Sequence, residues 1–305
     1  MKSSRVSLEQ AANRPPLWPL YPLSKNIAAR VRAIYMVKQL KAQPTRISDY
    51  RQGKRSDTLA LLASGASINQ LTDSQWNFIS EQCDSFGFNN WLLHPFVPTY
   101  YVGEFPRDAL ARRRWIENLT IRAADYYDRH VSIKRWEKFP AETRQLMSDS
   151  RMELSLAWSP NIGGNSERTF ARNLRFWDSL GLYRSDIALW NKASSLDYLI
   201  QIGFRARYKS IILCGVDLSD INYFYEHRPI QDFARARGLA IPPSGQTART
   251  HKTFDSSRVY GGVPIDRVIF HLRAELLDAA SCRLFVANES SALYPALPLH
   301  PAFRQ

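Results

Sequence analysis

The stretch TLALLASGASINQL, residues 58–71, contains the pattern that decides the fold. Its first half is a short apolar run that predicts a buried strand, and the run breaks at Ser64, Gly65, Ala66 and Ser67 before the chain becomes polar. Small residues directly after a strand let the backbone approach a ligand closely, and the N–H groups of a following helix can bind an anion. This turn is therefore a candidate phosphate site, although many α/β proteins make such a turn without a ligand.

Short apolar runs separated by helical spacers continue along the chain. Further runs bounded by turn residues occupy residues 84–88, 99–102, 152–158, 210–216 and 283–287. Spacers such as residues 108–127 and 266–280 have helical periodicity. The alternation predicts an α/β fold with a mainly parallel, doubly wound sheet and helices on both faces. Ligands of such sheets bind outside the carboxyl ends of the strands, so we seek function in the residues after each strand.

Size and composition are those of an ordinary globular protein. The chain has 305 residues, of which 45% are hydrophobic and 23% are charged, enough for one large core or two small ones. No apolar run approaches the roughly 18 residues of a membrane span, and the N-terminus lacks the apolar segment of a secretion signal. Cys83, Cys214 and Cys282 lie far apart in apolar contexts, which favours reduced thiols in a cytoplasmic protein.

A strong positive charge indicates an anionic partner and is concentrated near the N-terminus. The net charge is +13, and residues 1–55 contain 12 Lys and Arg against Glu9 and Asp49, a net +10. We see no zinc-finger spacing, RNP-like motif or basic aromatic stripe in the body of the chain, so nucleic acid is not the favoured partner. We divide the chain into a basic leader, residues 1–55, and a Rossmann-like domain, residues 56–305.

The leader combines a proline-rich aromatic piece, RPPLWPLYPL, with the segment SKNIAARVRAIYMVKQLKA at residues 24–42. In the second segment apolar residues fall near helical spacing among lysines and arginines, which predicts a basic amphipathic helix. One interpretation is a peripheral anchor on anionic lipid. The other is a helix packed on its own domain with a solvated basic face.

Small, polar or aromatic residues follow four of the predicted strands. They are the turn at residues 64–67; Asn89 and Asn90; Gly215, Asp217, Tyr223 and Tyr225; and Asn288, Ser290 and Ser291 ahead of a predicted helix. Amides can donate and accept hydrogen bonds, and a carboxylate can accept from ribose hydroxyls. Each group also has an ordinary interpretation as a turn, a cap or half-buried packing. Their shared position at one edge of the sheet favours a common function.

The order of these segments is the basis of a resemblance to a known family. The segments are ASGASI, CDSFGFNNW, WNKASSLDYLIQIGFRARYKSIILCGVDL and RLFVANESSAL, within residues 58–293. In order and spacing they resemble the bacterial CMP-sialic-acid-dependent sialyltransferases of the Campylobacter lipooligosaccharide type, glycosyltransferase family 42. The resemblance implies a Rossmann-like, GT-A-like sialyltransferase fold. It also implies inverting transfer of a sugar, most often sialic acid, from a CMP-sugar to a lipooligosaccharide or polysaccharide.

Donor-binding roles follow from the resemblance, position by position. It places Ser64 and Gly65 at the nucleotide-phosphate turn, with Ser64 where the family has asparagine. Asn89 matches an asparagine that contacts the donor near the phosphate. Gly215 to Leu218 match the segment that lines the cytidine. The full expected donor-binding set is Ser64, Gly65, Ser67, Asn89, Ser194, Ser195, Gly215, Asp217, Leu218, Asn288 and Ser290.

Catalytic roles follow in the same way, and a lid is expected at about residues 225–264. Lys192 stands where the family has an active-site arginine, which keeps the charge but loses the bidentate fork. The resemblance aligns Tyr223 or Tyr225, together with Tyr260 in the lid, with tyrosines whose hydroxyls stabilise the departing phosphate.

The general base is the clearest departure from the family. The family presents a histidine shortly after its lid tyrosine, whereas GGVPID follows Tyr260 here. His251 in the same lid is the nearest candidate, with Asp266 or another acid, or a retaining mechanism, as alternatives. His271 lies in a helical stretch, where packing or solvation is the favoured interpretation.

The expected reaction needs no metal, because CMP is a single-phosphate leaving group that hydroxyls, N–H groups and one cation can stabilise. No Asp-x-Asp motif or ligand-spaced His and Cys cluster occurs in the sequence. Two alternatives stay open: a transferase that uses CMP-Kdo in lipopolysaccharide synthesis, and a non-catalytic or pterin pyrophosphokinase-like relative. We expect a cytoplasmic protein, peripheral on the inner face of the plasma membrane if the leader binds lipid, with homo-oligomers possible.

Overall fold

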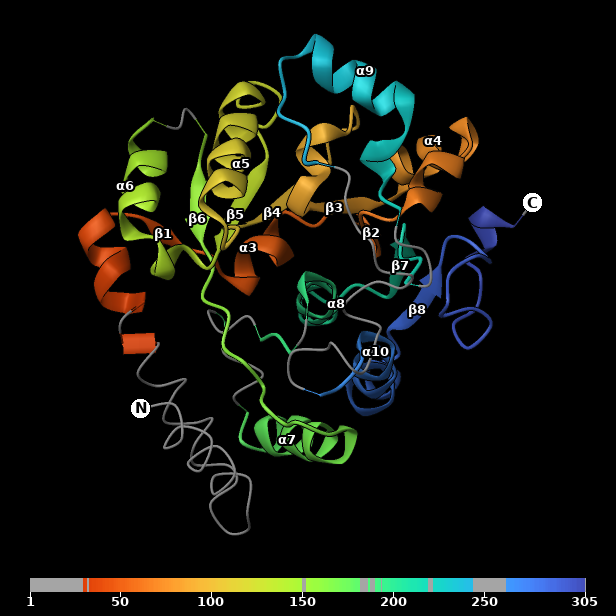
Figure 1. Cartoon of the computed structure of the whole chain (residues 1–305). Coiled ribbons are helices and arrows are strands. Elements are labelled where there is room, and N and C mark those ends of the chain that lie inside the picture. Colours follow the sequence, from red (N-terminus) through yellow and green to blue (C-terminus); the bar gives the residue numbers. More distant parts are fainter. Residues whose placement is uncertain are drawn as a thin grey trace.

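A parallel sheet forms the centre of the molecule (Figure 1). The structure is a computed structural model that describes residues 30–31, 33–149, 152–181, 186, 190–192, 194–218, 222–243 and 262–304. In spatial order the strands of this part are β1 (Gln43–Pro44), β6 (Leu154–Leu156), β5 (His130–Lys134), β4 (Tyr100–Glu104), β3 (Asp84–Phe88), β2 (Thr58–Leu62), β7 (Ser210–Cys214) and β8 (Arg283–Val286). All neighbours pair in parallel, which confirms the predicted α/β fold.

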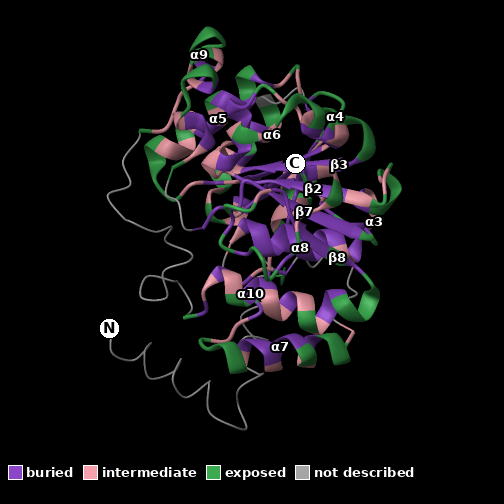
Figure 2. Ribbon diagram, turned by 90° about the vertical axis from the view of Figure 1, so that its right-hand side faces the viewer, coloured by how far each residue is buried: buried purple, intermediate pink, exposed green. Residues whose placement is uncertain are grey.

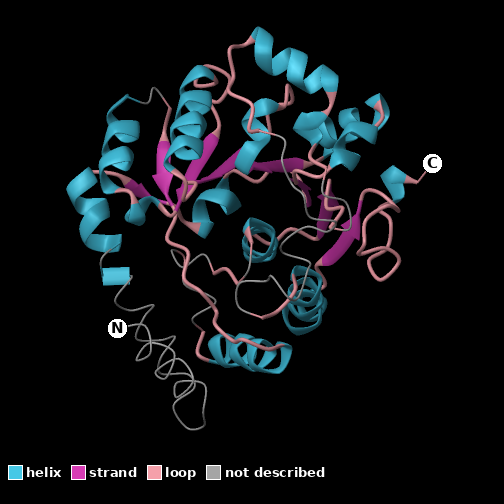
Figure 3. Cartoon of the chain, viewed as in Figure 1, coloured by secondary structure: helices cyan, strands magenta, loops and turns pink. Residues whose placement is uncertain are grey.

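Helices cover both faces of the sheet (Figure 3). One layer contains α3 (Ile47–Gln52), α7 (Glu167–Ser179), α8 (Ser195–Arg205) and α10 (Ile265–Leu272). The other layer contains α4 (Asp73–Gln82), α5 (Ala109–Ile121), α6 (Pro140–Asp149) and α9 (Arg228–Ala236). The predicted spacers agree with these helices: Asp108 is the N-cap of α5, and α10 continues into a π-helical turn at Arg273–Leu277.

The central position of β2 explains why the first half of the stretch at residues 58–71 is apolar. Leu59 and Leu61 pack into the layer that contains α8, and Ala60 and Leu62 pack into the opposite layer. All four side chains are fully buried, as the colouring of Figure 2 shows for the sheet as a whole. A strand buried on both faces has a continuous apolar run rather than an alternating one.

The direction in which successive strands are added to the sheet reverses beside β2. From β2 the chain adds β3, β4, β5 and β6 on one side, and after α7 and α8 it places β7 on the other side of β2. The carboxyl ends of β2 and β7 therefore form a topological switch point, the place where parallel α/β sheets bind ligands.

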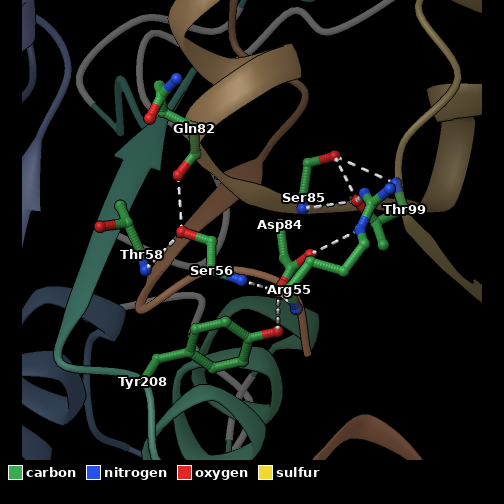
Figure 4. A network of polar contacts seen from close by, with 8 residues as sticks. All are labelled: Arg55, Ser56, Thr58, Gln82, Asp84, Ser85, Thr99 and Tyr208. Carbon is green, nitrogen blue, oxygen red and sulfur yellow. Dashed lines mark hydrogen bonds and ion pairs between the residues drawn. The ribbon is translucent and has the colours of Figure 1, made fainter. Parts of the chain in front are cut away.

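At the opposite, amino-terminal edge, a network of polar contacts joins the strand starts (Figure 4). The carboxylate of Asp84 is fully buried and accepts hydrogen bonds from the backbone N–H groups of Arg55 and Ser56 at 2.9 and 3.2 Å. It also accepts from the hydroxyl of Tyr208 at 2.9 Å and from Nε of Arg55 at 3.3 Å. These bonds fasten the entries of β2, β3 and β7 to one another.

All three cysteines are buried free thiols, as predicted. Burial raises the pKa of Cys83 to about 12 and the pKa of Cys282 to about 11, so both thiols stay neutral and unreactive at physiological pH. None of the described helices combines the length and the hydropathy needed to cross a bilayer.

Candidate functional site

The loops after β2 and β7 meet at the switch point. The N–H of Gly65 donates to the carbonyl of Gly215 at 2.9 Å. The backbone N–H of Ser67 donates to Oδ2 of Asp217 at 2.9 Å, and the Ser67 hydroxyl donates to Oδ1 through a short hydrogen bond. Asp217 is buried and so holds the start of the 3₁₀ turn Ala66–Gln70. The structure thus brings together two of the four predicted strand ends.

Glycine is required at this contact for steric reasons. A Cβ on Gly65 would lie 2.5 Å from both the Gly215 carbonyl oxygen and Oδ2 of Asp217. Gly215 has a φ of +67°, and its Cβ would lie 2.4 Å from Cγ1 of Ile68. The packing of the two loops on each other therefore accounts for both glycines, and the N–H groups of Gly65 and Ser67 already donate to acceptors within the protein. Phosphate binding at this turn stays a prediction.

A pair of tyrosines lies beside the same contact. The rings of Tyr223 and Tyr225 are stacked, with centroids 5.0 Å apart and an interplanar angle of 13°. Tyr223 forms an antiparallel bridge with Gly65, and the next backbone N–H donates to the carbonyl of Ser64 at 3.0 Å. Burial raises the pKa of Tyr225, although a hydrogen bond with Asn90 opposes the shift. Its hydroxyl therefore stays protonated and can donate.

The end of β3 contacts this tyrosine pair through Asn90. The preceding residue, Asn89, is left-handed with a φ of +56°, and its carbonyl accepts from the hydroxyl of Tyr101 at 2.6 Å. The indole of Trp115 donates to the same hydroxyl at 2.9 Å. These bonds hold the strained turn, so the predicted donor residue Asn89 lies at the carboxyl edge beside the switch point.

The start of α8 forms a second polar group at the same edge but in the opposite helix layer. Ser194 is the N-cap, and its hydroxyl accepts from the N–H groups of residues 196 and 197. Asp197 in turn accepts from the N–H groups of Lys192 and Ser194, each at 2.6 Å. The buried ammonium of Lys192 donates to the carbonyl of Gly164 in the loop after β6. Burial lowers the pKa of Lys192 to about 8, against the opposing effect of Asp197.

Sequence reasoning missed a charged cluster that adjoins this helix start. Oε2 of Glu104, the last residue of β4, accepts from the Ser195 hydroxyl at 3.0 Å and lies 3.3 Å from Nζ of Lys134, which ends β5. Arg135 contacts Oε1 of Glu104 at 2.7 Å. Burial alone would raise the pKa of Glu104, but the two cations outweigh it and hold the pKa at about 2. Glu104 is therefore ionised and a poor proton acceptor at neutral pH.

Register explains why this cluster has no sequence signal. Glu104 and Lys134 are Cα partners in the β4–β5 pair, and β5 itself, with the sequence HVSIK, was not among the predicted strands. Polar residues occupy every second position of β5, so the sequence does not indicate that both faces of the strand are buried. The alternation of Val131 and Ile133 is the only pattern that could have identified it.

The loop after β8 differs from its prediction. Its residues form turns, whereas a helix was expected after Asn288. The Asn288 side chain accepts from the N–H of Ser290 at 2.8 Å and donates to Gln70 at 2.8 Å, which joins this loop to the turn after β2. The Ser291 hydroxyl donates to the Val216 carbonyl at 2.6 Å. The Asx turn satisfies the backbone locally, so no helix is needed to do so.

The remaining predicted residues divide into described and undescribed ones. His251 and Tyr260 lie outside the described residues. Leu218 is buried with a φ of +57°, directly after Asp217. Asp266 lies in the first turn of α10, 3.6 Å from Arg267. His271 contacts Glu167 of α7 at 3.4 Å, which agrees with the packed interpretation.

The two polar groups define the candidate site. Contacts link Ser64, Gly65, Ser67, Gly215, Asp217, Tyr223 and, through Gln70, Asn288. Lys192, Ser194 and Ser195 form the other group, on the α8 side of the edge. In the part of the chain that the structure describes, no three His, Cys, Asp or Glu side chains gather in a way that could hold a metal ion. Metal independence stays a prediction.

Comparisons with known proteins return solved sialyltransferase structures. No family model matches the chain, and no curated protein matches it. The monofunctional α-2,3-sialyltransferase Cst-I from Campylobacter jejuni is 13% identical, with 83% of each chain covered and a TM-score of 0.44. The sialyltransferase CstII from C. jejuni in complex with the substrate analogue cytidine-5'-monophosphate is 10% identical, with 81% of this chain and 86% of that chain covered and a TM-score of 0.42.

Proposed function

We propose that this protein is a glycosyltransferase that transfers a sugar, sialic acid in the first instance, from a CMP-activated donor to a cell-surface glycan acceptor. The observation that carries the proposal is the meeting of the ASGASI and CGVDL segments at the switch point. The family resemblance assigns these two segments to the phosphate and the cytidine of one nucleotide. Parallel sheets bind nucleotides at such a point, and both segments contribute to it through Gly65, Ser67, Gly215 and Asp217.

The proposed chemistry is in-line attack of an acceptor hydroxyl on the anomeric carbon of the donor. As the bond to CMP breaks, negative charge develops on the phosphate oxygens. Hydroxyls of Tyr223 or Tyr225, with Tyr260, would donate to this charge, and the Lys192 ammonium would stabilise it electrostatically. These groups suit a leaving group with a single phosphate, so the proposed reaction needs no divalent metal.

The proton of the acceptor hydroxyl requires a separate base. Glu104 is unsuitable because its pKa of about 2 leaves it with little affinity for a proton. His251 is the proposed base, because the ordinary pKa of histidine lies near neutrality. Asp266 is the alternative. Replacement His251→Ala should lower kcat by roughly 10²- to 10⁴-fold without changing CMP affinity. Unchanged turnover would remove His251 from the mechanism and make Asp266→Asn the next variant.

A second donor, CMP-Kdo, is favoured by one observation. GGVPID follows Tyr260 where the sialyltransferase family presents its histidine, so the part of the site that handles the sugar departs from that family. CMP-Kdo carries the same nucleotide and also a keto-sugar acid. The two donors would therefore share the switch-point contacts and differ in the lid.

Thermal unfolding with nucleotides tests the proposal. The purified protein is heated without ligand and with CMP, CDP, UDP or ATP, each with and without EDTA. A ligand that binds only the folded state raises the midpoint, and a concentration of 100 times Kd contributes about 2.7 kcal/mol. We expect CMP to stabilise the protein equally with and without EDTA. Stabilisation by ATP with magnesium, and none by CMP, would contradict the proposed function. CMP-sialic acid and CMP-Kdo are compared next.

The location proposed for the protein follows from its charge. The basic leader, residues 1–55, would hold the enzyme on an anionic membrane at the cytoplasmic face, where a lipooligosaccharide or other glycolipid acceptor is available.

A further inference from the structure

An apolar groove lies between the helix at residues 33–40 and the carboxyl ends of β1 and β6. Its volume is about 170 Å³, and its lining includes Ala33, Val37, Trp136, Leu156 and Trp158. An apolar cavity of roughly 150 Å³ is large enough to bind benzene. The groove can therefore accept part of a hydrocarbon chain.

The outer face of the same helix is also apolar. Val31, Ile34 and Tyr35 are 63%, 44% and 62% exposed, although Ala33 on the inner face is buried. Ile34 both lines the groove and is exposed, so the apolar surface continues from the groove onto the outer face. Contiguous exposed apolar side chains of this kind mark interaction surfaces.

Cations flank this apolar surface. Arg30 and Lys38 line the groove, and the guanidinium of Arg30 lies 5.9 Å from the ring centroid of Trp158. None of the lining residues is acidic. An apolar cavity with two cations at its rim matches an amphiphile with a hydrocarbon tail and an anionic head. The net charge of +10 in the surrounding leader adds to the attraction.

We infer that this groove binds an anionic membrane phospholipid, with one acyl chain among Trp136, Trp158 and Leu156 and the phosphate between Arg30 and Lys38. The inference identifies the seat of the membrane association in the proposed function and rests on that association, but it does not require the transfer reaction. It also unites the two interpretations of the leader helix, because the helix packs on its own domain with one face and meets lipid with another.

Position in the sheet gives the groove a functional consequence. It lies at the carboxyl ends of β1 and β6, the same edge as the switch point between β2 and β7. Four strand spacings of about 4.8 Å separate β6 from β2, so the two sites are about 20 Å apart along this edge. A protein seated on lipid by the groove would direct its strand ends toward the membrane surface and toward a glycolipid acceptor.

Vesicle binding by the full-length protein tests the inference. Vesicles of phosphatidylglycerol and of phosphatidylcholine are compared by sedimentation, and phosphatidylglycerol with brominated acyl chains is used to quench tryptophan fluorescence. The test variant Arg30→Gln/Lys38→Gln is matched by Arg113→Gln/Arg228→Gln, which removes the same charge from exposed sites on α5 and α9. The variants Ile34→Ser and Trp158→Phe probe the tail site.

The expected results distinguish the site for the lipid phosphate from the site for the acyl chain. Wild-type protein binds the anionic vesicles only, Arg30→Gln/Lys38→Gln lowers the partition coefficient about thirtyfold, and the control pair lowers it less than threefold. Brominated chains quench the wild type, and quenching falls in Ile34→Ser and in Trp158→Phe.

Several results would overturn the inference. They are absence of binding to anionic vesicles, an equal loss of the partition coefficient in the two double variants, and binding without quenching. A dimer that Ile34→Ser dissociates would also overturn it, because the groove would then bind a second copy of the chain. Stabilisation by CMP is measured on the same proteins. Loss of vesicle binding with CMP binding intact therefore concerns the lipid site alone, and the reverse result concerns the transferase proposal alone.

Discussion

The two edges of one sheet are built in different ways. At the amino edge, the buried carboxylate of Asp84 accepts four hydrogen bonds, all of them from residues shortly before β2 or β7 (Figure 4). At the carboxyl edge, the loops after β2 and β7 contact each other through Gly65 and Ser67, and Glu104 pairs with two cations, of which Lys134 is buried. Backbone strain does not distinguish the two edges, because left-handed non-glycine residues lie both after strands (Asn89, Arg135 and Leu218) and before strands (Lys41, Arg207 and Ser281). The difference indicates that one buried acceptor fastens the strand entries at the amino edge, whereas contacts between loops shape the carboxyl edge, where parallel sheets bind ligands.

The largest expected effect on the free energy of unfolding is at the amino edge. Asp84→Ala removes the shared acceptor of Arg55, Ser56 and Tyr208 and should lower the free energy of unfolding by roughly 4 kcal/mol, measured by urea denaturation. Tyr208→Phe keeps the carboxylate and should cost roughly 1–2 kcal/mol. At a temperature where both variants are folded, CMP affinity should equal that of the wild type. A selective loss of CMP affinity would break the division between the edges.

The next effect concerns the loop contact at the carboxyl edge. Gly215→Ala combines left-handed strain with a Cβ 2.4 Å from Ile68 and should cost about 3 kcal/mol. Gly238→Ala is the matched control, because Gly238 has a φ of +70° but open space around its Cβ, and it should cost about 1 kcal/mol. Only Gly215→Ala should also weaken CMP binding in calorimetry. Equal effects of the two variants on CMP affinity would mean that the loop contact does not shape the nucleotide site.

The smallest effect is a pH dependence at Lys192. Because its folded pKa is about 8, below the ordinary 10.5, kcat/KM should fall about tenfold between pH 7 and pH 9 as the ammonium loses its proton. Lys192→Arg keeps its charge throughout this range and should remove that limb of the profile.

The free energy of unfolding should change with pH in the direction opposite to that of kcat/KM. The cost of burying the charged ammonium is present below pH 8 and is relieved as the pH rises from about 8 to 10.5, where the unfolded state binds more protons. Wild-type stability relative to Lys192→Met should therefore increase over this window in urea denaturation. A pH profile of kcat/KM that is the same in wild type and Lys192→Arg would show that the charge of Lys192 has no part in catalysis.

Most of the sheet could be predicted because its strands are buried on both faces. The runs at β2, β7 and β8 are continuous and apolar, so their length and their flanking turns were sufficient. Strand β5 could not be found in this way, because His130, Ser132 and Lys134 alternate with its apolar residues. Its burial depends on partners more than 20 residues away in sequence, which no local pattern records.

The position of the candidate site in the fold could be predicted from the sequence, but the contacts within it could not. Alternating strands and helices place strand ends at one edge, so the turn at Ser64 and the segment around Asp217 could be paired in advance. The engagement of Asp217 by Ser67 could not be anticipated, because it depends on how two loops pack across the sheet. The ion pair between Glu104 and Lys134 depends on the register of β4 against β5.

Strand β1 has a consequence for the order of events during synthesis. Its sheet partner is β6. The hydroxyl of Thr45, directly after β1, forms a hydrogen bond with the hydroxyl of Ser155, 110 residues later. At translation rates of about 5–20 residues per second, β1 waits on the order of 10 s for this partner. During that interval the basic helix at residues 33–40 is already made, but the wall of the groove formed by Leu156 and Trp158 is not. A nascent chain thus presents its cationic, apolar segment to membranes before the lipid seat itself exists.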